Sequence, residues 1–326
     1  MRRRELLAAL GAGAAASAGC AGFRTRSALA PPLVEDRPDE PYLPTHVEGM
    51  KVVDMKEAGD YACALTYTYP HRFWTVTGDH VTQVDIESSD SVHLMPVVWH
   101  RETETVTPDV SPQVTVTRGE ETVVPTVSPW AMLSQPMGVH FGDNVQLPGD
   151  GTYDVSVTVG EPSSARTGDL ADAAGGTADF AFDFAASTLE EISYRDIPDD
   201  EQGAPGAVDP MRMEMLPSSQ APAPDDLPGT VRGTTRAGDV AVAVTTLPAA
   251  RMGGPEGETY VVVSPRTPHN RYPLVLTSLS ATLTRANEAV FEGTLEPTLD
   301  PDAGPHYGAT VGGVESGDEL TVGVDA

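Results

Sequence analysis

Short runs in which apolar and polar residues alternate recur along most of this 326-residue chain. Clear examples are 113–117, 152–159 and 179–184, and turn residues such as glycine and proline bound each of them. Alternation with a period of two is typical of strands that bury one face. Helical periodicity is almost absent, so the pattern predicts an all-β protein built of β-sandwiches rather than an α/β fold.

Two such β-rich regions are separated by a stretch of different composition. Residues 187–226 are rich in proline, glycine and aspartate and lack a periodic apolar pattern, which is typical of a linker. Strand patterns resume at 238–244 and 260–263. We therefore expect a first sandwich at 42–186 and a second at 227–326.

The two regions share landmarks in the same order. Arg118 and His140 in the first region correspond to Arg285 and His306 in the second, with steps of 22 and 21 residues from arginine to histidine. From each histidine to the next turn glycine the step is 11 residues in both regions. The shared order favours an internal duplication over a chance similarity of short β motifs.

The first residues predict export. Arg2-Arg3-Arg4 precede an alanine- and glycine-rich stretch that ends in Ser17-Ala-Gly-Cys20. This pattern predicts a twin-arginine signal peptide at 1–19 and a lipid on Cys20 after cleavage. The apolar run is shorter than the roughly 20 residues that a membrane-spanning helix needs. The proline- and acid-rich residues 20–41 then form a tether, and we expect an extracytoplasmic lipoprotein anchored in the cell membrane.

The chain is strongly acidic, with 48 Asp and Glu against 20 Lys and Arg and a net charge of −28. A nucleic-acid partner would need basic patches, so we expect none. Spread acidity with few lysines is typical of proteins that work in high salt. Only two cysteines occur, Cys20 and Cys63, so no intrachain disulfide framework is expected. Cys63 lies in a strand-like run, and we interpret it as a small core residue rather than a functional thiol.

Thioether and imidazole groups gather in residues 130–155, before a glycine-rich turn. Met132, Met137 and His140 form a set of soft donors that suits copper, while imidazole alone also suits zinc or iron. The alternative is that His140 is a turn histidine bonded to the backbone.

At these residues the chain resembles the periplasmic iron-transport family, copper-binding accessory proteins encoded beside iron permeases. The family signature is a Met-containing strand, a Gly-x-His-Tyr-Gly-x-Asn-Val turn and a Gly-x-Tyr strand. It corresponds here to Met132, Gly138, His140, Phe141, Gly142, Asn144, Val145, Gly151 and Tyr153. The turn at 304–311 resembles the same motif, and residues 42–50 resemble the opening strand of the family. The resemblance spans 42–186 and the later part of 227–326.

The resemblance implies immunoglobulin-like sandwiches, often dimeric, with a copper or iron ion held by Met and His from different strands and a nearby carboxylate. Carried over, it makes Met132 and His140 the first candidates. Met137 competes with Met132, because Met132 lies one residue further from His140 than the family spacing.

The early His-x-Glu pair of the family has no counterpart in residues 61–69, which contain no histidine. His46 with Glu48, or His71 beyond that strand, are the candidates to replace the pair.

The second region is weaker as a metal site. Steps of 8 and 3 residues back from His306, which match the steps from His140 to Met132 and Met137, reach Thr298 and Ala303. Neither carries a thioether. His269 could join His306, but we expect a structural role for this region.

The linker contains Met211, Met213 and Met215 at alternate positions, which would share one side of an extended segment. Such a row resembles thioether sites for Cu(I). The alternative, which we favour, is that these methionines dock on the face of a domain.

The sequence as a whole predicts an exported, membrane-anchored metal-binding accessory protein for iron uptake, with an iron permease as a possible membrane partner. The alternative is a structural or protein-interaction lipoprotein without a metal site. No nucleophile elbow, P-loop, zinc-protease or dinucleotide motif is present, so we do not expect an enzyme.

Overall fold

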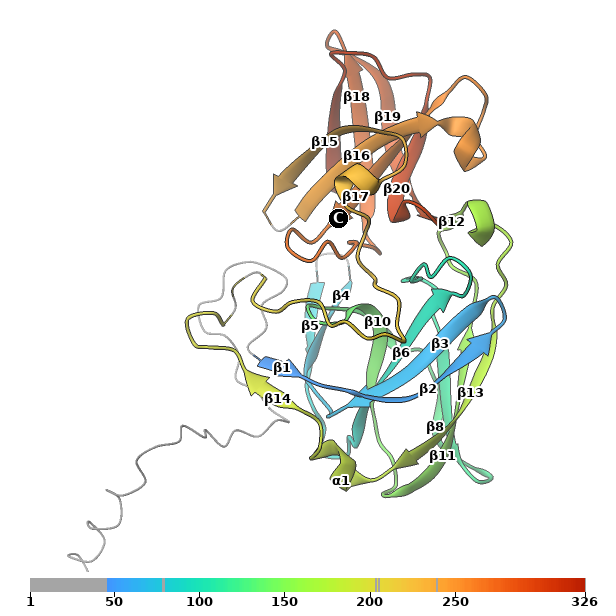
Figure 1. Ribbon diagram of the computed structural model, residues 1–326, viewed down its shortest axis with the longest axis vertical. Coiled ribbons are helices and arrows are strands. Elements are labelled where there is room, and N and C mark those ends of the chain that lie inside the picture. The colour runs from blue at the N-terminus through green and yellow to red at the C-terminus, as the bar shows by residue number, and fades with distance from the viewer. Residues whose placement is uncertain (1–45, 78–79, 203, 205, 239, 326) are drawn as a thin grey trace, which may run out of the picture.

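The chain folds into two β-rich lobes, with the N-terminal lobe below and the C-terminal lobe above in Figure 1. The structure is a computed structural model that describes residues 46–325 except 78, 79, 203, 205 and 239. The predicted signal peptide, tether and lipid site at Cys20 lie outside the described residues. Within the described residues, no helix is long and apolar enough to cross a membrane.

The first lobe is a sandwich of two antiparallel sheets. The five-stranded sheet has the order β2 (Lys51–Ala58), β3 (Tyr61–Thr68), β6 (Val92–His100), β10 (Gly138–Val145) and β9 (Trp130–Ser134). The four-stranded sheet has the order β13 (Gly176–Phe184), β11 (Gly151–Val159), β7 (Gln113–Arg118) and β8 (Glu121–Val127). The alternation in the sequence places one face of each strand in the core between the sheets. The prediction of an all-β sandwich fold is therefore confirmed.

The core between these sheets contains Cys63, Leu65, Tyr153 and Phe180, each almost fully buried. Burial raises the pKa of the Cys63 thiol to about 12, as expected for a small core residue and not for a reactive thiol.

Smaller elements border this sandwich. They are the two-stranded ribbon of β1 (His46–Glu48) and β14 (Tyr194–Asp196), the hairpin of β4 (Phe73–Thr77) and β5 (His80–Val84), and the short helix α1 (Ala186–Leu189). In Figure 1 the ribbon of β1 and β14 lies at one side of the first lobe.

The second lobe forms one curved sheet that folds over its own core. Its order is β15 (Thr230–Ala237), β16 (Val240–Pro248), β17 (Thr259–Arg266), β20 (Gly304–Val311), β19 (Glu288–Asp300), β18 (Ser278–Arg285) and β21 (Glu319–Asp325). The long strand β19 pairs with β18 along its first part and with β20 along its last part, so it belongs to both layers. Val263, Leu283, Leu295 and Tyr307 fill the core between these layers.

The two lobes share one strand order. Each pairing along this path has its counterpart in the first lobe. In the first layer β15 to β16 matches β2 to β3, β16 to β17 matches β3 to β6, β17 to β20 matches β6 to β10, and β20 to β19 matches β10 to β9. In the second layer β19 to β18 matches β8 to β7, and β18 to β21 matches β7 to β11. Two features differ. β8 and β9 are separate strands, divided by Ser128 and Pro129, where β19 is continuous, and β13, which pairs with β11, has no counterpart in the second lobe. His140 and His306 therefore lie on topologically equivalent strands. Descent of the lobes from one duplicated domain stays a prediction.

The linker between the lobes packs along the first lobe before it reaches the second. After β14 the yellow segment in Figure 1 crosses the first lobe before it enters the second. Within this segment the Met211 amide donates to the Pro136 carbonyl oxygen, and the Ala221 amide donates to that of Arg271. The strand β12 (Ala165–Arg166) of the first lobe also pairs in parallel with β19. Hydrogen bonds from both lobes thus hold the linker in place.

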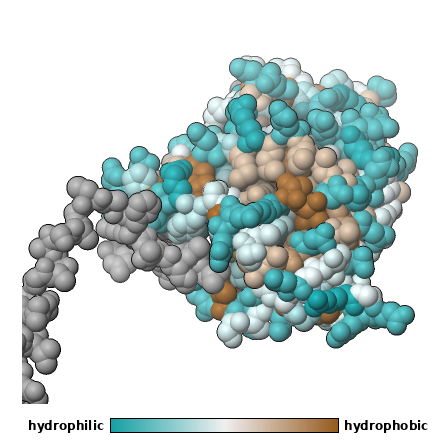
Figure 2. Space-filling model, turned by 60° about the horizontal axis from the view of Figure 1, so that its bottom comes forward, coloured by the Kyte–Doolittle hydropathy of each residue, from teal (hydrophilic) through white to brown (hydrophobic). Residues whose placement is uncertain are grey.

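The surface carries both hydrophilic and apolar residues. Figure 2 shows hydrophilic residues over much of one face, with apolar residues gathered near its middle.

Candidate metal centre

The hairpin of β9 and β10 places His140 and Met132 directly opposite each other. They are register partners in the antiparallel pair, together with Gly142 and Trp130 two residues further along. Directly opposed residues on adjacent antiparallel strands project from the same face of the sheet. His140 is 4% exposed, and its Nδ1 donates to the Gly138 carbonyl oxygen at 2.9 Å. Because Nδ1 carries the proton, Nε2 of the neutral ring keeps its lone pair.

His93 lies on β6, beside β10, and is fully buried. Its Nδ1 is 2.8 Å from the side-chain oxygen of Asn144, which also accepts the His71 amide at 3.2 Å. The Asn144 amide nitrogen donates to the His71 carbonyl oxygen at 2.9 Å, which fixes the orientation of the amide. The Asn144 oxygen can only accept, so His93 Nδ1 carries the proton and Nε2 has the free lone pair.

His71 and Glu48 complete the cluster from outside the sheet. The His71 ring stacks on the His93 ring with centroids 3.9 Å apart. His71 Nδ1 lies 2.8 Å from Glu48 Oε1, but without the alignment of a hydrogen bond. Glu48 is brought here by the short strand β1, and His71 by the segment between β3 and β4. Residues separated by almost a hundred positions therefore meet at this face.

Three buried polar atoms of this cluster lack a hydrogen-bond partner. They are Glu48 Oε2, His71 Nδ1 and His93 Nε2. Buried polar groups in folded proteins are nearly always hydrogen-bonded, so each exception calls for an explanation. Three exceptions in one cluster fit a site that a cation completes.

Gly142 leaves the space in front of the donors open. A Cβ atom at this position would lie 2.5 Å from His93 Nε2 and 2.9 Å from the Met132 sulfur. Any side chain here would collide with both groups, so the glycine of the motif keeps two donor atoms facing one small space.

Burial keeps these imidazoles neutral. It holds the pKa of His93 well below the ordinary histidine value, and repulsion from His71 adds to this effect. Burial likewise lowers the pKa of His140 to about 4, although the hydrogen bond to Gly138 acts in the opposite direction. A neutral imidazole is the form that binds a metal ion.

The cluster is not a finished coordination shell. In the part of the chain that the structure describes, no three His, Cys, Asp or Glu side chains are arranged to hold a metal ion together. The stacked rings of His71 and His93 would have to separate, and the Met132 thioether would have to contribute. The donor set of imidazole, thioether and carboxylate fits copper.

Of the other candidate residues, His46 lies beside the cluster, whereas Met137 and His306 lie outside it. His46 stacks on Tyr194 at 5.1 Å between centroids, and the neighbouring Glu48 and His71 both affect its pKa, which burial lowers. Met137 lies in the turn between β9 and β10, where it lines a different cavity. His306 is in the second lobe.

His93 is the residue of this cluster that sequence reasoning missed. It lies within Val92-His-Leu-Met95, an apolar run that is typical of a buried strand. The sequence offers one signal, the alternation of faces along a strand. The core residues Val92, Leu94 and Val98 share one face, so His93 projects from the opposite face.

The equivalent position in the second lobe is closed by hydrogen bonds. His306 is the register partner of Thr298, as His140 is of Met132, and Tyr260 takes the position of His93. The Tyr260 hydroxyl lies 3.2 Å from Thr298 Oγ1 and 3.4 Å from His306 Nε2. A Cβ at Gly308, the counterpart of Gly142, would lie 2.0 Å from the Tyr260 hydroxyl. A tyrosine thus fills the space that stays open in the first lobe.

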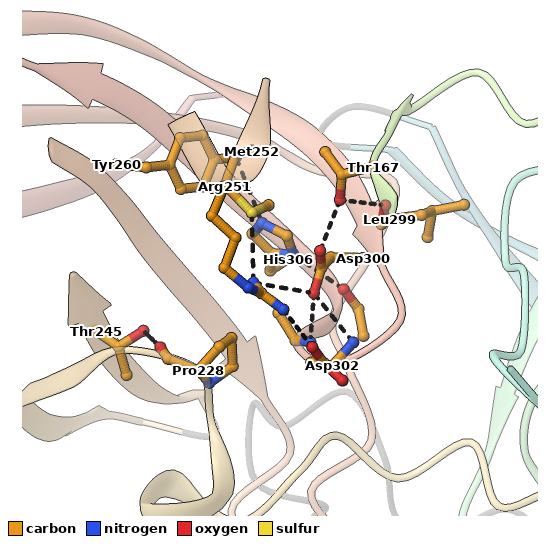
Figure 3. Close-up of polar contacts among 12 residues, drawn as sticks. Thr167, Pro228, Thr245, Arg251, Met252, Tyr260, Leu299, Asp300, Asp302 and His306 are labelled. Atoms are coloured by element: carbon orange, nitrogen blue, oxygen red, sulfur yellow. Dashed lines mark hydrogen bonds and ion pairs between the residues drawn. The ribbon is translucent and has the colours of Figure 1, made fainter. Parts of the chain in front are cut away.

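Figure 3 shows this second-lobe position beside a buried carboxylate. Asp300 accepts hydrogen bonds from Thr167 at 2.7 Å and from the Ala303 amide at 2.9 Å, and Arg251 lies 3.7 Å away. Burial alone would raise the pKa of Asp300, but these partners lower it. The carboxylate is therefore already satisfied by protein groups, and through Thr167 it joins the two lobes.

The first lobe is thus a β-sandwich with a buried cluster of imidazole, thioether and carboxylate groups on the outer face of one sheet. Residues 101–195 match the family model described as Fe²⁺ transport protein, and residues 225–326 match a domain of unknown function, DUF7350. The first match confirms the resemblance to the iron-transport family for that part of the chain.

Two solved structures are similar to this chain. A copper-bound variant of FetP from uropathogenic Escherichia coli is 15% identical, with 41% of this chain and 97% of that chain covered and a TM-score of 0.30. FetP of the same organism, as isolated, is 17% identical, with 43% and 96% covered and a TM-score of 0.29. No curated protein matches the chain.

Proposed function

We propose that the first lobe binds a copper ion through His93, His140 and Met132, with His71 and Glu48 completing the site, in an accessory protein for iron uptake. The observation that supports this most directly is the group of three buried polar atoms without hydrogen-bond partners, on Glu48, His71 and His93. A cation bound there once the stacked rings of His71 and His93 separate would satisfy all three. A purely structural histidine cluster would leave them unsatisfied at a cost of about 1–3 kcal/mol each.

The donor types favour copper over harder ions. Thioethers and imidazoles suit copper, whereas the carboxylate and carbonyl sites of Mg²⁺ and Ca²⁺ need several oxygens. Asn144 would act as the outer partner that holds His93 in the required tautomer, as is usual for histidine ligands.

The place in iron uptake is supported by the match of residues 101–195 to the Fe²⁺ transport protein family. In this proposal the protein acts outside the cytoplasm, tethered through lipid on Cys20, and serves a membrane iron permease. Copper is its resident ion, iron is the cargo, and the chain is not an enzyme.

The test is copper titration of the metal-free protein at high salt. His93→Ala, His140→Ala and Met132→Leu should each weaken copper binding at least 10-fold, because even outer-partner substitutions typically cost about 10- to 100-fold. His306→Ala is the matched control, since it removes the topologically equivalent histidine of the other lobe. Its copper affinity should equal that of the wild type.

Unchanged affinity in both His93→Ala and His140→Ala would overturn the proposal. An equal loss in His306→Ala would show that these histidines support the fold and not the ion. Tighter binding of Fe²⁺ than of copper would contradict the choice of metal.

A further inference from the structure

Two methionines of the linker, Met211 and Met213, lie against the first lobe, close to Met137. Met211 and Met213 are half-buried, whereas the intervening Arg212 and the following Glu214 are exposed. The Met211 amide donates to the Pro136 carbonyl oxygen at 2.5 Å, which ties the segment to the turn between β9 and β10. A turn at residues 214–216 then breaks the alternation, and Met215 faces solvent with 47% of its surface exposed. Only two of the three linker methionines therefore face the lobe.

Met137, from that same turn, lines one cavity together with Met211 and Met213. The cavity has a volume of about 330 Å³, and its remaining walls are mainly apolar, including Val97, Val139, Leu216 and Tyr272. The Met137 backbone is fixed by its amide, which donates to Ser134 Oγ at 3.1 Å. Three methionines from two distant segments of the chain therefore line one space.

Packing accounts for part of this arrangement, because Met137 packs against the buried cluster of Val97, Trp99 and Val139. Met211 and Met213 stay half-buried and line the cavity with it. Methionine is the side chain that adapts best to a space of irregular shape. The unbranched side chains of the three methionines can close on a small occupant, and neutral thioether sulfurs are soft ligands that select Cu(I).

We infer that Met137, Met211 and Met213 form a second metal site, which binds a soft monovalent cation, Cu(I), through three thioethers. The site is separate from the histidine cluster and does not rest on it. Val97 lines the cavity and His93 belongs to the cluster; they lie four residues apart on β6, roughly 13 Å at the usual rise of a strand. The net charge of −28 favours cations over anions at such a surface.

The experiment measures how many equivalents of Cu(I) the full chain binds, by competition with a chromophoric Cu(I) chelator under reducing conditions, and repeats the measurement with the redox-inert probe Ag(I). Met211→Leu combined with Met213→Leu preserves volume and apolar character, so the fold should persist. This double variant should lose one equivalent of both ions. Met215→Leu, on the same segment but facing solvent, is the matched control and should lose none.

Wild-type stoichiometry in the double variant would overturn the second site, and so would an equal loss in Met215→Leu. The results for the two proposed sites can be told apart. Cu(II) binding should be unchanged in the linker double variant, and the linker equivalent of Ag(I) should persist in His93→Ala.

Discussion

Asn144 illustrates how one side chain can organise a whole site. Its amide nitrogen donates to the His71 carbonyl oxygen and its side-chain oxygen accepts the His71 amide. The same oxygen also accepts a hydrogen bond from His93 Nδ1. The same residue thus positions one imidazole and sets the tautomer of another. This is the role that hydrogen-bonded outer partners play at metal centres.

Asn144→Ala should therefore weaken copper binding by roughly 10- to 100-fold while the three donor side chains stay in place. Thr310→Ala is the matched control, because Thr310 occupies the equivalent position opposite Tyr260 in the second lobe. Titration of both variants with copper measures the difference. Wild-type affinity in Asn144→Ala would mean that His93 needs no outer partner.

His306 gives a pH dependence that does not involve the metal cluster. Burial lowers its pKa below the ordinary value of 6.5. The groups that face it are Asp300 on β19, Arg251 before β17, and Tyr260 on β17. The pKa of Asp300 is lowered and that of Tyr260 is raised to about 12, so neither of these two titrates between pH 5 and 7. In this range His306 binds a proton in the unfolded chain but stays neutral in the folded chain.

Stability of the second lobe should therefore fall as pH drops below roughly 6.5, by up to about 1.4 kcal/mol per pH unit from this histidine, until the lowered pKa of the folded state is reached. Urea unfolding of metal-free protein between pH 7 and 5 measures this slope. His306→Gln should reduce the slope, and substitution of the exposed His269 by Gln should not. A slope unaffected by His306→Gln would contradict the assignment.

At the scale of elements, the two hairpins that carry His140 and His306 differ in one respect. The strand before His140 is interrupted at Pro129, so β9 is short and half-buried, whereas β19 continues through both layers. The interruption frees β9 from β8, and its Met132 faces the open space above Gly142. In the second lobe Thr298 and Tyr260 close that space with hydrogen bonds.

Exchange of these two residues tests the difference. Tyr260→His combined with Thr298→Met should give the second lobe three donors with His306 and add one weak equivalent of copper. The affinity should remain below that of the first lobe, because no counterpart of Glu48 or His71 is supplied. Copper stoichiometry measured beside the single Tyr260→Phe variant provides the check. No added equivalent in a folded double variant would show that the strand framework alone does not make a site.

At the scale of the whole molecule, the second lobe and the linker hold the turn between β9 and β10. Asn270 donates to the carbonyl oxygens of Gln135 and Val208, both at 3.2 Å, and Tyr272 donates to that of Pro136. Ser219 accepts the Val139 amide. The hairpin that presents Met132 and His140 is thus fixed at its turn by groups from outside its own lobe.

Asn270→Ala should destabilise the protein by about 1–3 kcal/mol, because it leaves two buried carbonyl groups without their donor. It should also weaken copper binding, since the hairpin is less well held. Asn287→Gly, at an exposed turn with φ of 67°, is the control and should change stability by a few tenths of a kcal/mol at most. Urea unfolding and copper titration measure both effects. Full copper affinity in a destabilised Asn270→Ala protein would show that the turn is held for stability alone.

The sequence by itself determined the strands and the facing of Met132 and His140. Both follow from local rules, since alternation places every second residue in the core and a hairpin opposes residues at a fixed step. Counting 8 residues back from His306 picked out Thr298 as the counterpart of Met132, and the register places Thr298 opposite His306.

Only the tertiary structure decided which distant residues join them. His93 lies in an apolar run whose local pattern is that of a core strand. Its free Nε2 becomes part of a site only when β6, β10 and the segment of His71 have packed together. Glu48 and His71 are selected by loops and a short edge ribbon, which follow no periodic pattern. The methionines of the linker were ambiguous for the same reason, because the third sulfur of their cavity comes from a turn more than seventy residues away.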